Sequence, residues 1–194
     1  MAAAKPIIGE QRMTRFKWLV YSLLFCNLIY YLSGSTIREA VDYSGWVLLL
    51  IAFEWQERGL VAGDRSSSLG LGQQRLVLGL QLAGYTLATF ACGAYFQAGD
   101  WLDFANALLW LLVCAVLVFD LYWPGHYGSR GWRLRNASKI LLYAGLIGIA
   151  ISFGLTADWM DFYDAILWLL CFFVIELKLF TLEAPIPQQS DISG

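Results

Sequence analysis

The sequence predicts an all-α integral membrane protein with six transmembrane helices. Hydrophobic residues make up 59% of the chain and charged residues only 14%, whereas a typical soluble domain is about 45–50% apolar. The apolar residues also form continuous runs, and a helix needs roughly 20 apolar residues to cross the hydrocarbon core. Strands of a membrane barrel alternate between apolar and polar side chains, so these runs favour helices.

Six apolar runs follow one another along the chain and define the expected spans. The second run is the weakest, because Glu54, Glu57 and Arg58 fall in its last third. The first run is expected to stay as an anchor, since no convincing signal-peptide cleavage site follows it. The runs cover residues 16–34, 42–61, 76–98, 104–123, 139–156 and 162–182.

Domain organisation follows from these spans. Residues 1–185 are predicted to form one six-helix membrane domain, and the polar, Pro-containing segment 186–194 is predicted to be a disordered cytoplasmic tail. The spans pair into three hairpins, at about 16–61, 76–123 and 139–182.

Basic residues predict the orientation, because Lys and Arg are retained on the cytoplasmic side of short loops. Only Arg38 lies on the opposite side. Both termini are therefore predicted to be cytoplasmic, and the short chain without eukaryotic sorting signals favours a bacterial inner membrane. The cytoplasmic set is Lys5, Arg12, Arg15, Lys17, Arg58, Arg65, Arg75, Arg130, Arg133, Arg135, Lys139 and Lys178.

An internal repeat supports the hairpins. The segment "DWLDFANALLWLL" at 100–112 recurs as "DWMDFYDAILWLL" at 158–170 when Trp110 is aligned with Trp168. A fainter copy surrounds Trp46. All three hairpins begin on the same side of the membrane, so they are predicted to be parallel repeats in a pseudo-threefold bundle, unlike the inverted repeats of many transporters.

Two stripes of small residues are predicted to be helix-packing faces, because small side chains let helices approach closely in lipid. One stripe lies in the third span and the other in the fifth. Their members are Gly84, Ala88 and Cys92, and Ala144, Gly148 and Ser152.

The outer turns collect acidic residues, which form a candidate outer acidic mouth. One interpretation is helix capping, because an Asp just before a helix accepts hydrogen bonds from free backbone N–H groups. A second is a carboxylate ring that concentrates cations at a pore mouth. A third is Mg²⁺ binding by Asp158, Asp161 and Asp164. The acidic residues are Glu39, Asp42, Asp100, Asp103, Asp158, Asp161 and Asp164.

Deeper polar residues form a candidate ion pathway. Glu54 and Glu176 occupy the same repeat position, where the middle repeat has Val118 and only the displaced Asp120 nearby. Charged groups inside a membrane are costly and usually functional. The structural alternative pairs Glu54 with Arg58 and leaves Glu176 near the headgroups. Asn27 is either packing glue between helices or part of the same pathway.

The residue types in this sequence favour transport over catalysis. The single His126, the scattered Cys26, Cys92, Cys114 and Cys171, and the lack of a nucleophile elbow predict no enzyme, no metal and no cofactor. The expected partners are the lipid bilayer and other membrane subunits or further copies of the chain, without nucleic acid. The predicted function is a cation- or proton-translocating channel or transporter. The alternative is a noncatalytic membrane subunit or assembly factor of a larger complex.

Overall fold

Six long helices make up the described part of the chain. The computed structural model describes the backbone of residues 8–62, 70–122 and 130–183, and the side chains of 14–56, 70–119 and 130–173. No strand occurs within these ranges, so the all-helical prediction is confirmed. The helices are α1 (Ile8–Gly34), α2 (Ile37–Ala62), α3 (Leu71–Ala98), α4 (Trp101–Tyr122), α5 (Arg130–Leu155) and α6 (Trp159–Glu183).

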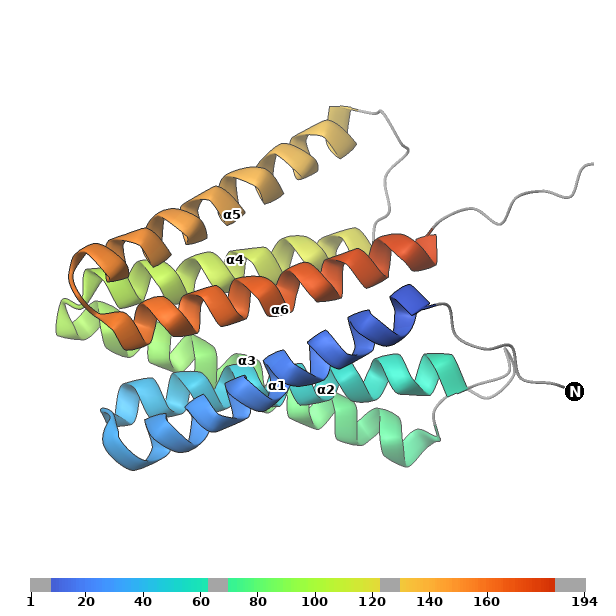
Figure 1. Cartoon of the computed structure of the whole chain (residues 1–194), viewed down its shortest axis with the longest axis horizontal. Helices are drawn as coiled ribbons and strands as arrows, with labels where there is room; N and C mark the ends of the chain where they lie inside the picture. Colours follow the sequence, from blue (N-terminus) through green and yellow to red (C-terminus); the bar gives the residue numbers. More distant parts are fainter. Residues whose placement is uncertain (1–7, 63–69, 123–129, 184–194) are drawn as a thin grey trace, which may run out of the picture.

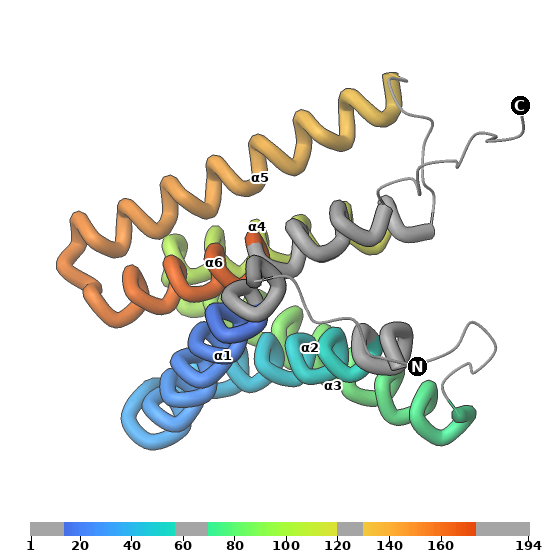
Figure 2. The backbone as a smooth tube through the Cα atoms, turned by 45° about the vertical axis from the view of Figure 1, so that its right-hand side comes forward, coloured from blue at the N-terminus to red at the C-terminus, as the bar shows by residue number. Residues whose placement is uncertain are grey.

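The helices run antiparallel to their neighbours and form a closed ring of contacts (Figure 1). Each helix contacts the next one in sequence, and α6 contacts α1. The end of α5 that begins at Arg130 is splayed away from the bundle, as both ribbon views show (Figure 2). The other end of α5 is held through the turn to α6.

Two of the three short turns between helices, at 99–100 and 156–158, are built in the same way. Gly99 has φ 78°, and its N–H donates to the Phe96 carbonyl while the next N–H donates to Tyr95. Ala157 has φ 62°, and the Ala157–Asp158 pair repeats this pattern on Gly154 and Phe153. This left-handed helix ending favours glycine, so Ala157 holds a conformation that its Cβ disfavours.

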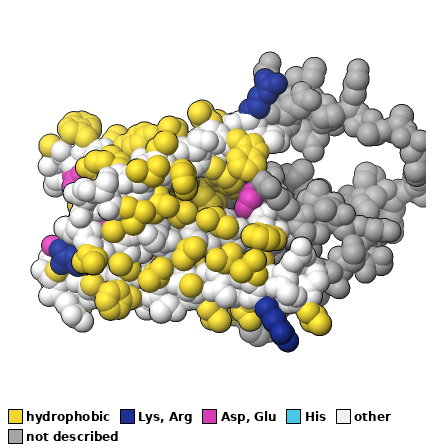
Figure 3. Space-filling view, turned by 90° about the horizontal axis from the view of Figure 1, so that it is seen from below, with side chains coloured by type: hydrophobic (Ala, Val, Ile, Leu, Met, Phe, Trp, Pro, Cys, Tyr) yellow, Lys and Arg dark blue, Asp and Glu magenta, His cyan; other side chains and the backbone are white. Residues whose placement is uncertain are grey.

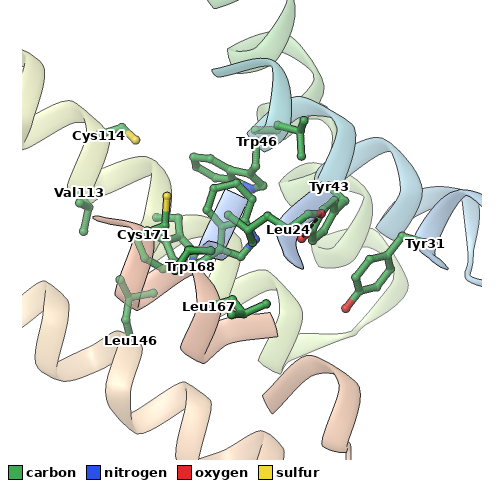
Figure 4. Packing of buried hydrophobic residues seen from close by; sticks show 14 residues of the cluster. Leu24, Tyr31, Tyr43, Trp46, Val113, Cys114, Leu146, Leu167, Trp168 and Cys171 are labelled. Carbon is green, nitrogen blue, oxygen red and sulfur yellow. Dashed lines mark hydrogen bonds between the residues drawn. The ribbon is translucent and has the colours of Figure 1, made fainter. Parts of the chain in front are cut away.

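Trp46 and Trp168 lie together in the buried core (Figure 4), and Trp110 belongs to the same cluster. The ring centroid of Trp46 on α2 lies 6.4 Å from that of Trp110 on α4 and 6.4 Å from that of Trp168 on α6. Phe172 also packs on Trp110 at 4.6 Å. The same tryptophans align in the sequence repeat. Below, Trp46, Trp110 and Trp168 are called the tryptophan layer.

The small-residue stripe of α3 is a packing face, as predicted. Gly84, Ala88 and Cys92 are buried. A Cβ on Gly84 would lie 2.7 Å from Cγ of Leu49 and 2.9 Å from the carbonyl oxygen of Gly45. Helices α2 and α3 therefore touch through their backbones.

The small-residue stripe predicted on α5 is wrong. Ala144 and Gly148 are exposed, and a Cβ on Gly148 would meet no atom within 4 Å. The buried face of α5 instead carries Leu146, Ala150 and Phe153. Other glycines of α5 approach its neighbours closely: a Cβ on Gly145 would lie 3.2 Å from Cδ1 of Leu109 on α4, and a Cβ on Gly154 would lie 3.3 Å from Cδ2 of Phe162 on α6.

Apolar side chains cover the middle of the molecule, and charged ones lie near its two ends (Figure 3). Within the described residues, four helices are long and apolar enough to cross a membrane: α1, α3, α4 and α5. The described part of α2 carries Arg38, Glu39, Asp42 and Glu54, and the described side chains of α6 end at Phe173. The exposed Trp101 and Trp159 at the outer turns are typical of a membrane interface.

Candidate functional site at the acidic end of the bundle

The acidic end begins with the N-terminal residues of α2, α4 and α6. Each of these helices starts directly after a polar residue: Thr36, Asp100 or Asp158. Thr36 and Glu39 form a reciprocal capping box, in which the Thr36 hydroxyl donates to Glu39 Oε1 at 2.8 Å and accepts from the Glu39 N–H at 3.4 Å.

The two aspartates at this position have different partners. Asp158 Oδ1 accepts a hydrogen bond from the N–H of Asp161 at 3.4 Å, which is the capping role expected for it. Asp100 forms an ion pair with Arg38, with 2.8 Å between Nη2 and Oδ2. This pair joins α2 to the turn between α3 and α4. It is half-exposed, so it contributes at most about 1 kcal/mol.

One helical turn further in lie Glu39, Asp103 and Asp161, which occupy the same repeat position. The buried Tyr31 of α1 donates its hydroxyl to Asp161 Oδ1 at 2.7 Å. Asp103 is within electrostatic range of Asp100, Glu39 and Asp158. Three hairpins therefore contribute a carboxylate to one layer.

A second polar layer consists of Asp42 and Asp164, and Asn106 occupies the equivalent position of the sequence repeat on α4. The buried Asn27 of α1 donates its amide N–H to Asp164 Oδ1 at 2.9 Å, and the buried Tyr43 donates its hydroxyl to the Leu24 carbonyl of α1 at 3.1 Å.

Its other carboxylate, Asp42, accepts the indole N–H of Trp46 at 2.9 Å. Asp42 and Asp164 are also within electrostatic range of each other. The second layer thus rests directly on the tryptophan layer.

An ion pair lies toward the other end of the molecule, where Glu54 accepts from two α1 side chains. Lys17 Nζ lies 2.6 Å from the carboxylate, and the Tyr21 hydroxyl donates to it at 3.1 Å. The side chains of Lys17 and Glu54 are only 6% and 14% exposed. Lys17, which the charge pattern assigns to the cytoplasmic side, is one of two buried polar residues in the described part of the chain. It is buried because Glu54 is its partner.

The remaining pathway residues form two groups: Asn27, whose side chain is described, and Asp120 and Glu176, whose side chains are not. Asn27 lies in the second polar layer. Glu54 of α2 instead contacts Lys17 and Tyr21, which lie nearer the start of α1, so the structure does not bring Asn27 and Glu54 together. The side chains of Asp120, Glu176, Arg58 and Lys178, together with the whole of His126 and the tail 186–194, lie outside the described residues. The pathway through Glu176 and Asp120 stays a prediction.

The described residues give no support to the Mg²⁺ interpretation. Among them, no group of three His, Cys, Asp or Glu side chains is placed to hold a metal ion. The described cysteines are free thiols; Cys92, Cys114 and Cys171 are buried and Cys26 is exposed.

Sequence reasoning missed the α1 partners of the carboxylates, namely Lys17, Tyr21 and Tyr31. A signal for one of them was present. Lys17 and Glu54 stand at equal sequence distances from the turn at Ser35 and Thr36, so an antiparallel hairpin places them side by side. No comparable signal exists for Tyr31, because its partner Asp161 comes from another hairpin.

Comparison with family models, curated proteins and solved structures finds no match to this chain. The functional conclusion therefore depends on the geometry of the two polar layers, the tryptophan layer and the buried ion pair.

Proposed function

We propose that this chain is a membrane protein that binds cations at its acidic end and conducts or transports cations or protons. The observation that carries the proposal is the second polar layer. Asn27 is buried, Asp42 and Asp164 are half-buried, and Asn27 donates to Asp164 within a bundle whose exposed surface is largely apolar. Polar and ionisable residues inside a membrane bundle are costly and mark ion pathways by default.

The proposed architecture is three parallel hairpin repeats with both termini cytoplasmic in a bacterial inner membrane. Two features support the repeat. Helices α2, α4 and α6 start at Ile37, Trp101 and Trp159, which are equivalent in the ungapped alignment, and the equivalent tryptophans meet in the core. Basic residues at the start of α1, α3 and α5 support the cytoplasmic termini.

Accessibility labelling tests this topology. In a variant whose four cysteines are replaced by serine or alanine, a single cysteine is placed at position 37, 101 or 159. These side chains are 81%, 62% and 66% exposed, so each should react with a membrane-impermeant maleimide from the periplasmic side. Reaction of position 101 and position 159 from opposite sides would refute the parallel repeat.

The mechanism follows from the order of the layers. The carboxylates of the outer layer raise the local concentration of cations, as acidic rings do at channel mouths. The second polar layer offers oxygen atoms to a cation that has lost part of its water. The tryptophan layer then closes the bundle axis, so conduction requires its indoles to move or the cation to pass beside them.

Flux in proteoliposomes tests the function. The Asp42→Asn/Asp164→Asn double variant removes both charges of the second layer, and Asn106 shows that an amide fits this position. Potassium and proton flux should fall at least about tenfold. A control Tyr163→Phe variant, half-exposed on α6, should retain flux. Unchanged flux in the double variant would rule out this layer as the pathway.

The inner carboxylates need their own measurement. The Glu54→Gln/Glu176→Gln variant should also lower flux if both residues relay the cation or proton. If flux is unchanged, the proposed relay through these two residues is wrong, whatever the result for the second layer.

The alternative function, a noncatalytic subunit or assembly factor, is favoured by one observation. Glu54 is held by Lys17 and Tyr21, and a carboxylate that already has a cation as its partner is poorly suited to relay another. Purification in mild detergent separates the two proposals. A subunit should retain a stoichiometric partner and show no flux alone, whereas a transporter should show flux as the isolated chain.

A further inference from the structure

An open pocket lies where α1, α2 and α6 meet at the acidic end. Its volume is about 420 Å³, which is within the range of roughly 300–1,000 Å³ typical of small-molecule sites. A water molecule takes up about 30 Å³, so a single dehydrated metal ion would leave most of this pocket empty. The lining residues are Tyr30, Tyr31, Gly34, Ser35, Thr36, Glu39, Asp158, Met160 and Asp161.

The charge of the pocket is entirely negative. Glu39, Asp158 and Asp161 contribute three carboxylates, and no basic side chain is among the described residues that line it. Arg38, the nearby cation in sequence, is engaged with Asp100 at another turn. These three carboxylates do not form a group placed to hold a metal ion among the described residues, but a larger cation can lie between them.

Aromatic and thioether groups supply the rest of the pocket's chemistry. Tyr30 and Tyr31 meet edge to face, with 5.5 Å between ring centroids. Tyr30 is 50% exposed, whereas Tyr31 is fixed by its hydrogen bond to Asp161. Tyrosine faces attract ammonium groups, and aromatic residues combined with carboxylates are the usual means of recognising quaternary ammonium ligands.

We infer that this pocket binds an organic cation, namely an ammonium ion with an apolar body. Its charge is balanced by Glu39, Asp158 and Asp161, and its alkyl groups pack on Tyr30, Tyr31 and Met160. This inference rests on the proposed function, because the pocket is then the first site that the transported cation occupies. It narrows the substrate class from any cation to organic ammonium ions.

Tetraethylammonium is a suitable probe, and its binding to the full chain in detergent is measured by isothermal titration calorimetry. Glu39→Gln removes one charge but keeps the capping box, in which Gln also serves, and should weaken binding about tenfold. Tyr30→Leu removes one aromatic face and should weaken binding about three- to tenfold. Tyr163→Leu is the matched control: Tyr163 is 40% exposed and lies outside the pocket. It should change affinity less than twofold.

The outcomes separate this inference from the proposed function. Saturable binding that weakens in both pocket variants and not in the control supports the pocket. Absence of saturable binding, or binding that the pocket variants leave unchanged, overturns the inference, and potassium and proton flux still decide the proposed function. Binding at the pocket without flux of tetraethylammonium, potassium or protons keeps the pocket but refutes transport.

Discussion

Removing the charge of Lys17 is expected to destabilise the protein far more than removing Lys17 and Glu54 together. The two charges lie 2.6 Å apart, and both side chains are largely buried. At an effective dielectric constant of about 20, two unit charges at this distance attract each other by about 6 kcal/mol. Desolvation costs several kcal/mol for each ion. The attraction and the desolvation cost therefore nearly cancel.

This balance determines the expected change in the free energy of unfolding for each variant. Lys17→Met leaves Glu54 buried with Tyr21 as its donor, and should lower the free energy of unfolding by about 3–5 kcal/mol. Glu54→Gln removes the negative charge opposite the buried Lys17 ammonium and should cost a similar amount. The double variant Lys17→Met/Glu54→Leu removes both desolvation costs, so its stability should lie within about 1 kcal/mol of the unmodified protein.

Unfolding in mixed micelles with increasing SDS, followed by tryptophan fluorescence, provides the four free energies of a double-mutant cycle. Arg75→Met is the control, because Arg75 is an exposed basic side chain on α3 and its loss should change stability by no more than about 0.5 kcal/mol. The reasoning is refuted if Lys17→Met is as stable as the unmodified protein. It is also refuted if the double variant is destabilised by the sum of the two single effects.

Three further changes should alter stability in the same assay. Gly84→Ala pushes a methyl group against the Gly45 carbonyl and Leu49 and should cost about 1–3 kcal/mol, whereas Gly148→Ala, which meets nothing within 4 Å, should be neutral or slightly stabilising. Ala157→Gly relieves a left-handed conformation and should stabilise by about 1 kcal/mol; a loss of stability would contradict the turn geometry. Asn27→Ala removes a donor to Asp164 and should cost about 1–3 kcal/mol, and a neutral result would show that this hydrogen bond contributes nothing.

The course of the helices could be predicted because the apolar runs are long and the turns between them are short. Predicted span ends at 34, 61, 98, 123, 156 and 182 agree closely with the observed helix ends. The starts were predicted too late, since polar first turns such as Ile37–Val41 and Leu71–Arg75 are helical but not apolar. Hydropathy identifies the residues expected to lie in lipid, whereas the backbone hydrogen bonds of a helix continue beyond the apolar run.

The carboxylates of the site could be predicted, but most of their partners could not. The repeat places Glu39, Asp103 and Asp161 at equivalent positions, so their shared layer follows from the sequence. Tyr31 and Asn27 reach α6 across the closure of the ring, where residues more than 100 positions apart meet. Such contacts depend on which faces of α1, α3 and α5 point toward the interior of the bundle. The pattern of small residues predicted the inward face correctly for α3 and wrongly for α5.

The middle hairpin departs from the other two in a way that bears on the proposed pathway. It has Asn106 where the others have Asp42 and Asp164, and Val118 where they have Glu54 and Glu176. The acidic positions that are lost all belong to α4. At these two repeat positions, the acids therefore come only from α2 and α6.

The α1 side chains Asn27 and Tyr31 bind α6 carboxylates, and the pocket lies between the same three helices, α1, α2 and α6. The tryptophan layer fills the centre of the bundle, whereas the hydrogen-bonded polar groups lie along α1, beside this layer. If the chain moves cations as proposed, they pass between α1, α2 and α6, and the tryptophan layer serves packing. Substitutions in α4 should then affect stability more than flux, and substitutions along α1 should affect both.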